Sequence, residues 1–201
     1  MKSSKNIPKL NLPTILTLSR IVVIPFFIYV TPLSNFLGAL IFIAASITDF
    51  LDGYLARRNG QVTTFGAIID PIADKFFVIA ALIMLVDMDR VSVVAAVIII
   101  VREFLITALR VVALKMDVVI KAEMGGKLKT TAQITAIICL ILGWGTLGVP
   151  PLDWFIGFLR EIGLDLFDIG TIALWISVVL GVGSGIQYIV VFWNRTLGTQ
   201  E

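Results

Sequence analysis

Apolar residues fill six long stretches of the chain, each close to the roughly 20 residues that a helix needs to cross the hydrocarbon of a bilayer. The stretches cover residues 12–30, 33–57, 66–86, 91–114, 128–147 and 169–193. The pattern predicts an all-α integral membrane protein with six transmembrane helices. We expect these helices to form a single domain over residues 1–201.

Two shorter segments mix apolar and charged residues. Residues 150–167, chiefly 152–167, place Trp154, Phe155, Phe158 and Leu159 among charges at helical spacing, a pattern typical of a helix lying along a membrane surface. Residues 1–11 resemble a similar interfacial segment. No small-residue cleavage site follows 12–30, so we expect that stretch to be a retained span rather than a signal peptide.

Composition supports lipid as the main solvent and excludes several kinds of chemistry. Of 201 residues, 58% are apolar and 15% are charged, and the mean hydropathy is +1.00. The net charge of +2 is too small to indicate a nucleic-acid partner. A single cysteine excludes an internal disulfide, and the lack of histidine excludes zinc–histidine sites and Ser-His-Asp hydrolysis. Carboxylates, hydroxyls, Arg or Lys must carry any catalysis.

Basic residues lie mainly on one side of the predicted membrane. They precede 12–30, follow 33–57, separate 91–114 from 128–147, and follow 169–193. The other side has Arg90 and Arg160 among several acids. Because loops on the cytoplasmic side are rich in Lys and Arg, we expect a multi-pass protein of the cell (inner or plasma) membrane with both termini in the cytoplasm.

Two pairs of aspartates lie at the predicted cytoplasmic ends of neighbouring spans. Asp49 and Asp52 are three residues apart, and Asp70 and Asp74 are four apart, so each pair shares one helix face. Two antiparallel helices can direct both pairs to one point, where four carboxylates would repel one another unless cations neutralised them. Oxygen ligands favour Mg²⁺, Mn²⁺ or Ca²⁺, and two such ions are typical of phosphoryl chemistry. The pattern predicts a polar cavity and a two-ion site on the cytoplasmic side.

The main alternative from another class is a divalent cation transporter. Transport predicts acids spread across the depth of the membrane, whereas these four share one level and 128–147 and 169–193 contain none. This distribution favours an enzyme.

The residues around the acids form one spaced motif. It runs Asp49-x-x-Asp52-Gly53-x-x-Ala56-Arg57, then eight residues, then Gly66-x-x-x-Asp70-x-x-x-Asp74. Gly53 and Gly66 permit close approach of a ligand or, alternatively, tight helix packing. Arg57 can bind a phosphate or serve as a basic anchor at the inner surface.

This motif resembles the signature of the CDP-alcohol phosphotransferase family at every fixed position. Residues 11–20, 102–110 and 126–133 are also similar to the bacterial phosphatidylglycerophosphate synthase subgroup, so the resemblance extends to about residue 135. It implies a membrane enzyme that joins CDP-diacylglycerol to sn-glycerol 3-phosphate and releases CMP. It also implies a homodimer, with which the spacing of Gly181 and Gly185 is compatible, although those glycines can equally pack within one bundle.

The resemblance also implies roles for individual residues. Asp49, Asp52, Asp70 and Asp74 would hold two Mg²⁺ or Mn²⁺ ions, and Asp74 would act as general base. Positions that would bind the CDP-lipid are Pro13, Thr14, Gly53, Ala56, Arg57, Thr63 and Gly66.

Five cations near the same level suggest a pocket for an acceptor that carries its own phosphate. They are Arg20, Arg102, Arg110, Lys127 and Lys129. Lys127 and Lys129 alternatively orient the stretch 128–147, and Arg102 is alternatively neutralised by Glu103 or by the acid cluster. The cations favour glycerol phosphate or inositol phosphate over serine. A second phosphatidylglycerol, as in a cardiolipin synthase, is a further alternative, and only the flanking resemblance selects glycerol 3-phosphate.

Overall fold

The computed structural model describes residues 22–59, 64–116, 124–143 and 147–197. For 49–59, 64–74, 114–115, 124–127 and 196–197 it describes the helical backbone but not the side chains. Every regular element in these ranges is helical, so the all-α prediction is confirmed there. After a helical segment at 22–30, the helices are α2 (Asn35–Asn59), α3 (Thr64–Asp87), α4 (Val93–Lys115), α5 (Met124–Leu142), α6 (Pro150–Glu161) and α7 (Leu166–Leu197).

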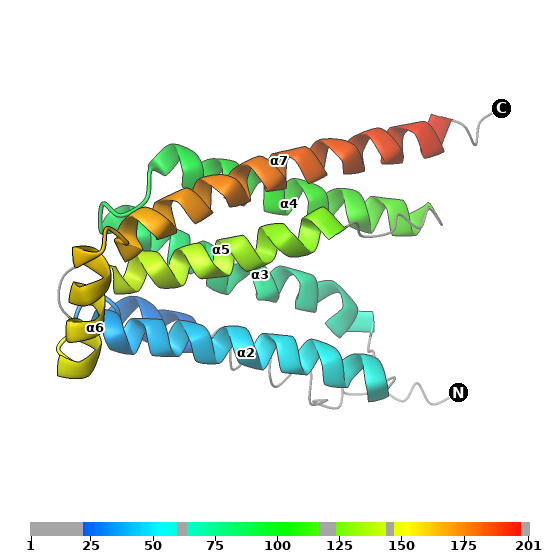
Figure 1. The fold of residues 1–201 in the computed structure, drawn as a ribbon. Coiled ribbons are helices and arrows are strands. Elements are labelled where there is room, and N and C mark those ends of the chain that lie inside the picture. The colour runs from blue at the N-terminus through cyan, green and yellow to red at the C-terminus, as the bar shows by residue number, and fades with distance from the viewer. Residues whose placement is uncertain (1–21, 60–63, 117–123, 144–146, 198–201) are drawn as a thin grey trace, which may run out of the picture.

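Five of these helices run side by side, and α6 crosses one end of the bundle (Figure 1). Successive long helices alternate in direction. As a result, the end of α2, the start of α3, the end of α4 and the start of α5 lie at the end of the bundle opposite α6. This arrangement places the acid-bearing and most of the cation-bearing helix ends together.

The helix ends agree with the hydropathy pattern for α2, α3 and α4, whose bounds lie within two residues of 33–57, 66–86 and 91–114. The prediction of 128–147 is wrong at its C-terminus, because α5 ends at Leu142. Close packing at Gly143 explains the early end. A Cβ atom there would lie 2.5 Å from the backbone nitrogen of Phe167, so the chain turns where α7 begins.

One stretch of the described residues, Leu166–Arg195 in α7, is long and apolar enough by itself to cross a membrane. Among the residues whose side chains are described, α2 and α5 contribute the shorter apolar segments Asn35–Thr48 and Leu128–Leu142. Six complete spans therefore stay a prediction.

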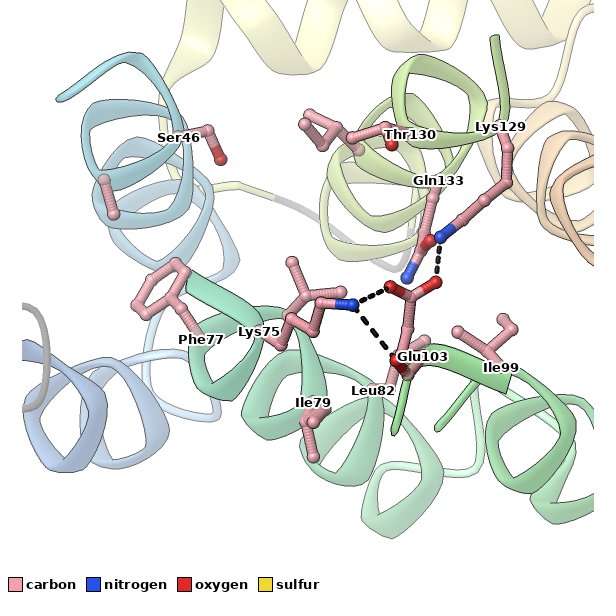
Figure 2. A pocket seen from close by; sticks show the side chains of 13 residues that line it. Ser46, Lys75, Phe77, Ile79, Leu82, Ile99, Glu103, Lys129, Thr130 and Gln133 are labelled. Carbon is pink, nitrogen blue, oxygen red and sulfur yellow. Dashed lines mark hydrogen bonds and ion pairs between the residues drawn. The ribbon is translucent and has the colours of Figure 1, made fainter. Parts of the chain in front are cut away.

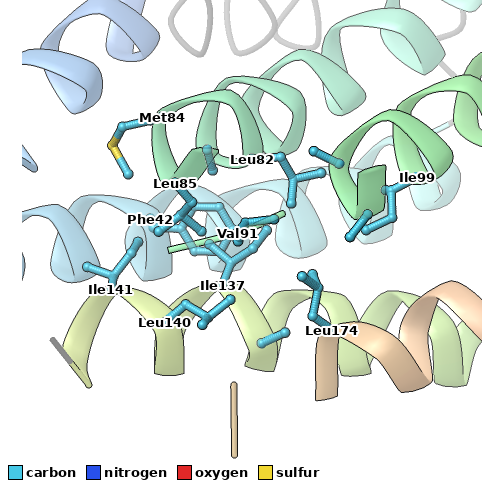
Figure 3. Packing of buried hydrophobic residues seen from close by; sticks show 14 of the residues in the cluster. Phe42, Leu82, Met84, Leu85, Val91, Ile99, Ile137, Leu140, Ile141 and Leu174 are labelled. Atoms are coloured by element: carbon cyan, nitrogen blue, oxygen red, sulfur yellow. The ribbon is translucent and has the colours of Figure 1, made fainter. Parts of the chain in front are cut away.

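The core is an apolar cluster between α5 and the helices that face it. Phe42, Leu82, Leu85, Ile137 and Leu140 are fully buried there, and Figure 3 shows their side chains meeting between α2, α3 and α5. Phe27, Phe42 and Phe77 form an aromatic group in which the Phe42 and Phe77 rings stack with centroids 5.4 Å apart. This stacking joins α2 to α3.

A buried arginine holds the α6 end of the bundle together. Arg90, in the turn between α3 and α4, is 6% exposed and donates hydrogen bonds to the side-chain oxygen of Asn35 and the backbone oxygen of Ile141. Burial lowers the pKa of this guanidinium from its ordinary value. The contacts join the start of α2 to the end of α5.

Helix α6 is amphipathic and separate from the long helices, as the mixed pattern at 150–167 predicts. Its buried residue is Ile156, whereas Trp154 and Phe158 stack against each other and face outward, Trp154 with 72% of its surface exposed. The Asp153 carboxylate accepts a hydrogen bond from the backbone nitrogen of Leu147 and so anchors the entry to the helix. The membrane-surface position of this segment stays a prediction.

The contact between α5 and α7 provides a test of the packing. A Cβ atom on Gly170 would lie 2.9 Å from the backbone nitrogen of Leu140, which has no room to move, whereas a Cβ on Gly183 of the same helix meets nothing within 4 Å. We expect Gly170→Ala to lower the free energy of unfolding by about 1–3 kcal/mol. Gly183→Ala should leave it unchanged or raise it, because alanine favours helix. Thermal unfolding in detergent measures both, and equal effects would contradict the packing.

Candidate active site

The four aspartates of the motif lie at matching levels on consecutive helices. Asp49 is ten residues before the end of α2, and Asp74 is ten residues after the start of α3. Asp52 and Asp70 are seven and six residues from the same two helix ends. At about 1.5 Å of rise per residue, each acid of one helix has a counterpart at nearly the same height on the other. Their side chains lie outside the described residues.

The best-defined polar feature of the described bundle is the carboxylate of Glu103 on α4, which is shared by three cations. Its Oε2 accepts from the Lys75 ammonium of α3 at 2.9 Å, and its Oε1 accepts from Arg102 at 2.9 Å and also from Lys129 of α5. The Glu103 side chain is 12% exposed and that of Lys129 7%. We call these four residues the Glu103 cluster; Figure 2 shows Lys75, Glu103 and Lys129 converging from three helices.

Lys75 uses all three of its donors within this cluster. The ammonium donates to the Glu103 carboxylate, to the Glu103 backbone oxygen at 3.1 Å and to the Thr107 hydroxyl. An ammonium has three N–H groups, so none is left for a ligand. Lys75 is therefore a tether between α3 and α4, one residue beyond Asp74.

Arg102 connects the cluster to α7. Its Nε donates to the backbone oxygen of Gly181 at 2.9 Å, and its Nη2 donates to the Ser184 hydroxyl at 2.8 Å. Side chains on Gly181 and Gly185 would touch the Arg102 side chain, so both glycines face α4 within the chain. Helix packing within one bundle accounts for this pair of glycines.

A cavity of about 210 Å³ lies beside the Glu103 cluster, between α2, α3, α4 and α5. Most of its wall is apolar. Its polar lining comes from Ser46, Lys75, Glu103, Lys129, Thr130 and Gln133. Ser46 is three residues before Asp49, and Lys75 directly follows Asp74, so the cavity lies next to the level of the acids.

An apolar groove follows the outside of α3. Its volume is about 760 Å³, and it is lined by Ile24, Pro25, Ile28 and Pro32 on one side and by α3 residues from Phe76 to Asp87 on the other. It begins two residues after Asp74 and continues along the helix away from the acids. Such a groove suits a hydrocarbon chain.

A family model described as CDP-alcohol phosphatidyltransferase matches residues 10–183. The chain belongs to this family. The match confirms the resemblance seen in the motif at 49–74. It also extends well past residue 135, to include the start of α7, so similarity in the last third of the chain exceeds what the sequence motifs alone indicated.

Curated relatives from several bacteria share most of their length with the chain. Proteins of Rickettsia typhi and Bacillus subtilis are 41% and 38% identical to it over 182 and 202 aligned residues, covering 89% and 92% of this chain and 94% and 96% of theirs. A Haemophilus influenzae protein is 38% identical over 90% of this chain and 92% of its own. All three carry the name CDP-diacylglycerol–glycerol-3-phosphate 3-phosphatidyltransferase.

Many of the predicted site residues lie outside what the structure describes. Pro13, Thr14, Arg20 and Thr63 are outside it entirely, and only the helical backbone is described for the residues Asp49, Asp52, Gly53, Ala56, Arg57, Gly66, Asp70, Asp74 and Lys127. Among the described side chains, which do not include these aspartates, there is no group of three acids or cysteines that could hold a metal ion.

The three described cations of the predicted acceptor pocket differ in their surroundings. Lys129 lines the cavity, Arg102 points to α7, and Arg110 is exposed on α4. Sequence reasoning missed the tether role of Lys75 and any role for Gln133, which is 3% exposed in the cavity wall. The sequence did contain a signal for Lys75, because an ionisable residue inside an apolar stretch requires a partner of opposite charge.

The Glu103 cluster provides a second test. Replacing the carboxylate leaves three cations close together with little water, so we expect Glu103→Gln to lower the free energy of unfolding by about 3 kcal/mol. Glu161→Gln, at an exposed position on α6, is the matched control and should change it by less than about 0.5 kcal/mol. Thermal unfolding of both variants in the same detergent is the measurement. A Glu103→Gln protein as stable as the control would show that the cluster does not hold the helices together.

Proposed function

We propose that this protein transfers the phosphatidyl group of CDP-diacylglycerol to sn-glycerol 3-phosphate and releases CMP. Membership of the family and about 40% identity to relatives named for this reaction support the proposal. The observation that carries the choice of acceptor is the cavity beside the acids, whose wall includes Lys129 and the Glu103 cluster. A cationic wall suits an acceptor that bears its own phosphate.

Two Mg²⁺ or Mn²⁺ ions fit the donor set of the motif. Asp49, Asp52, Asp70 and Asp74 supply four carboxylates from two helices at matching levels, and oxygen-only ligands select hard divalent ions. When bound, the ions would neutralise the negative charge of the pyrophosphate and of the CMP leaving group.

The chain's own residues position the reactants and move one proton. Asp74 accepts the proton of the glycerol 1-hydroxyl as that oxygen forms a bond to the phosphorus bearing diacylglycerol. The bond from this phosphorus to the oxygen of the CMP phosphate breaks, and CMP leaves with that electron pair. A carboxylate is a weak base, so its contribution depends on its place beside the attacking oxygen. The Lys75 tether, one residue away, holds this part of α3 against α4.

The CDP-lipid would be held between the motif and the apolar groove. Backbone positions without bulky side chains at Gly53 and Gly66 let the nucleotide approach, and Arg57 supplies a cation for a phosphate. The remaining positions assigned to this substrate are Pro13, Thr14, Ala56 and Thr63. The groove that begins at Phe76 suits one acyl chain, because it is apolar and continuous with the level of the acids.

The cations would have different roles in binding the acceptor. Lys129 faces the cavity, whereas Arg102 contributes its charge to the Glu103 cluster while contacting α7. Arg20, Arg110 and Lys127 complete the set of cations that the sequence predicts near the same membrane level. Together they would attract a dianionic acceptor from the cytoplasm.

We further propose six spans in the cell membrane, with both termini and the active site on the cytoplasmic side. The excess of Lys and Arg in the loops at that end supports this orientation. Helix α6, with outward-facing Trp154 and Phe158, would then lie along the outer surface. Exposed apolar residues on α7, Trp175 and Val179 among them, are compatible with lipid or with the second subunit of a homodimer.

A direct assay tests the reaction and the acceptor. Purified protein in detergent is incubated with CDP-diacylglycerol and, separately, with glycerol 3-phosphate, inositol phosphate or serine, and CMP release is measured. We expect release with glycerol 3-phosphate and little with the others. CMP release that needs no acceptor, or that requires serine, would contradict the proposal.

Removal of metal tests the two-ion centre. EDTA should abolish CMP release, and excess Mg²⁺ or Mn²⁺ should restore it, because four close carboxylates need the ions to bind the pyrophosphate. Asp74→Asn should lose turnover by at least about 100-fold while keeping the wild-type unfolding temperature. Full activity in EDTA would refute the centre, and near-normal turnover of Asp74→Asn would remove it as base.

A further inference from the structure

The Lys75 ammonium has two kinds of acceptor on α4. One is the Glu103 carboxylate, at 2.9 Å, which also binds Arg102 and Lys129. This carboxylate ends a flexible side chain, so its place depends on α5 as well as on α4. The other acceptors are the backbone oxygen of Glu103, at 3.1 Å, and the hydroxyl of Thr107. These two belong to the body of α4 and therefore define where along that helix the ammonium lies.

The Thr107 hydroxyl is a rigid acceptor. A side chain branched at Cβ has little rotational freedom in a helix. The hydroxyl also donates to the backbone oxygen of Glu103, one turn earlier, at 2.7 Å. With its hydrogen engaged there, its lone pairs have a fixed direction, and the Lys75 ammonium donates to one of them. Since the donor is charged, this contact is about twice as strong as a neutral hydrogen bond.

At this level α3 is held from two opposite sides. Lys75 contacts α4, and Phe77 stacks on Phe42 of α2 with ring centroids 5.4 Å apart. Two residues correspond to a turn of about 200° around a helix, so the two contacts lie on nearly opposite faces. In Figure 2, Lys75 points toward Glu103 and Phe77 points away from it. The pair of contacts therefore fixes the rotation of α3 about its own axis.

This rotation determines where position 74 lies. Position 74 is about 100° around the helix from Lys75 and about 60° from Phe77. It shares a face with Val78, four residues later, which lines the cavity between α2, α3, α4 and α5. A rotation of about 10° moves a group at the helix surface, about 5–6 Å from the axis, by about 1 Å. A displacement of about 1 Å at a catalytic group can cost about 100-fold in rate.

We propose that Thr107 is a positioning residue of the active site. Its hydroxyl holds the Lys75 ammonium at one place on α4, and this contact sets the rotation of α3 that brings position 74 opposite the aspartates of α2. Thr107 contacts neither the ions nor the substrates and acts only through Lys75. The inference rests on the proposed function, which assigns the two ions and the base to these aspartates.

The test removes the hydroxyl and then restores it. Thr107→Val keeps the shape of the side chain without the oxygen, and Thr107→Ser keeps the oxygen. Thr171→Val is the matched control, because the Thr171 hydroxyl donates to the backbone oxygen of Phe167 in the same way but near the start of α7, at the α6 end of the bundle. CMP release gives kcat, the KM for each substrate and the Mg²⁺ concentration for half-maximal activity.

We expect kcat of Thr107→Val to fall about tenfold or more, with the KM for each substrate changed by less than about twofold. Thr107→Ser should recover kcat to within about twofold of the wild type, and the control should match the wild type. A purely structural role would lower the unfolding temperature and leave the kcat of the folded protein unchanged, which would overturn the inference. So would a Thr107→Ser protein as slow as Thr107→Val.

A binding measurement separates this inference from the proposed reaction. Without substrates, Mg²⁺ should raise the unfolding temperature of the wild type, because ion binding stabilises the folded state. Thr107→Val should need about fivefold more Mg²⁺ for half of the shift, since carboxylate ligands must lie within about 0.2 Å of their preferred distance. Thr107→Ser and Thr171→Val should not. Thr107→Ala also lacks the hydroxyl and replaces Thr107→Val if that variant does not fold.

The outcomes of the two measurements differ for the two proposals. A wild type that releases no CMP with glycerol 3-phosphate would refute the proposed reaction, and the Mg²⁺ shift would still decide the role of Thr107. If the wild type is active and the four proteins need equal Mg²⁺, the positioning role fails and the reaction stands.

Discussion

The carboxylate of Glu103 forms ion pairs with three cations inside the bundle, where most other contacts between helices are apolar. Its two oxygens bind Lys75 of α3, Arg102 of α4 and Lys129 of α5, and Arg102 continues to the backbone of α7. A charge in such surroundings is costly unless its partners are close and well oriented. The helices that carry these residues are therefore restricted to one relative arrangement, and the cavity beside them depends on it.

This constraint has a functional consequence because the same charges belong to helices that carry the motif. Lys75 follows Asp74 directly, so the tether to Glu103 and Thr107 holds α3 against α4 next to the aspartate assigned as base. Lys129 binds the other oxygen of the Glu103 carboxylate and lines the cavity. The Glu103 carboxylate thus contacts both Lys75, which ties α3 to α4, and Lys129, which lines the cavity.

The apolar parts of the bundle have a different role. Phe42 and Phe77 stack between α2 and α3, and close packing at Gly170 brings α7 against α5. These contacts set the distances between helices, whereas the polar cluster sets which charged groups face one another. At the opposite end of the bundle, Arg90 also holds helices together through hydrogen bonds, which join the start of α2 to the end of α5.

The sequence by itself determined the helical class, most helix ends and the family, and it predicted a site at the four aspartates, because hydropathy, charge and motif spacing are local properties of the chain. It placed Arg102 and Lys129 together as cations near one level but could not say which cation is used by a neighbouring helix and which faces a cavity. That distinction depends on how α3, α4, α5 and α7 rotate against one another. Only the tertiary structure decided that Lys75 has no free donor and that Gln133, an uncharged polar residue in an apolar helix, lies buried in the cavity wall.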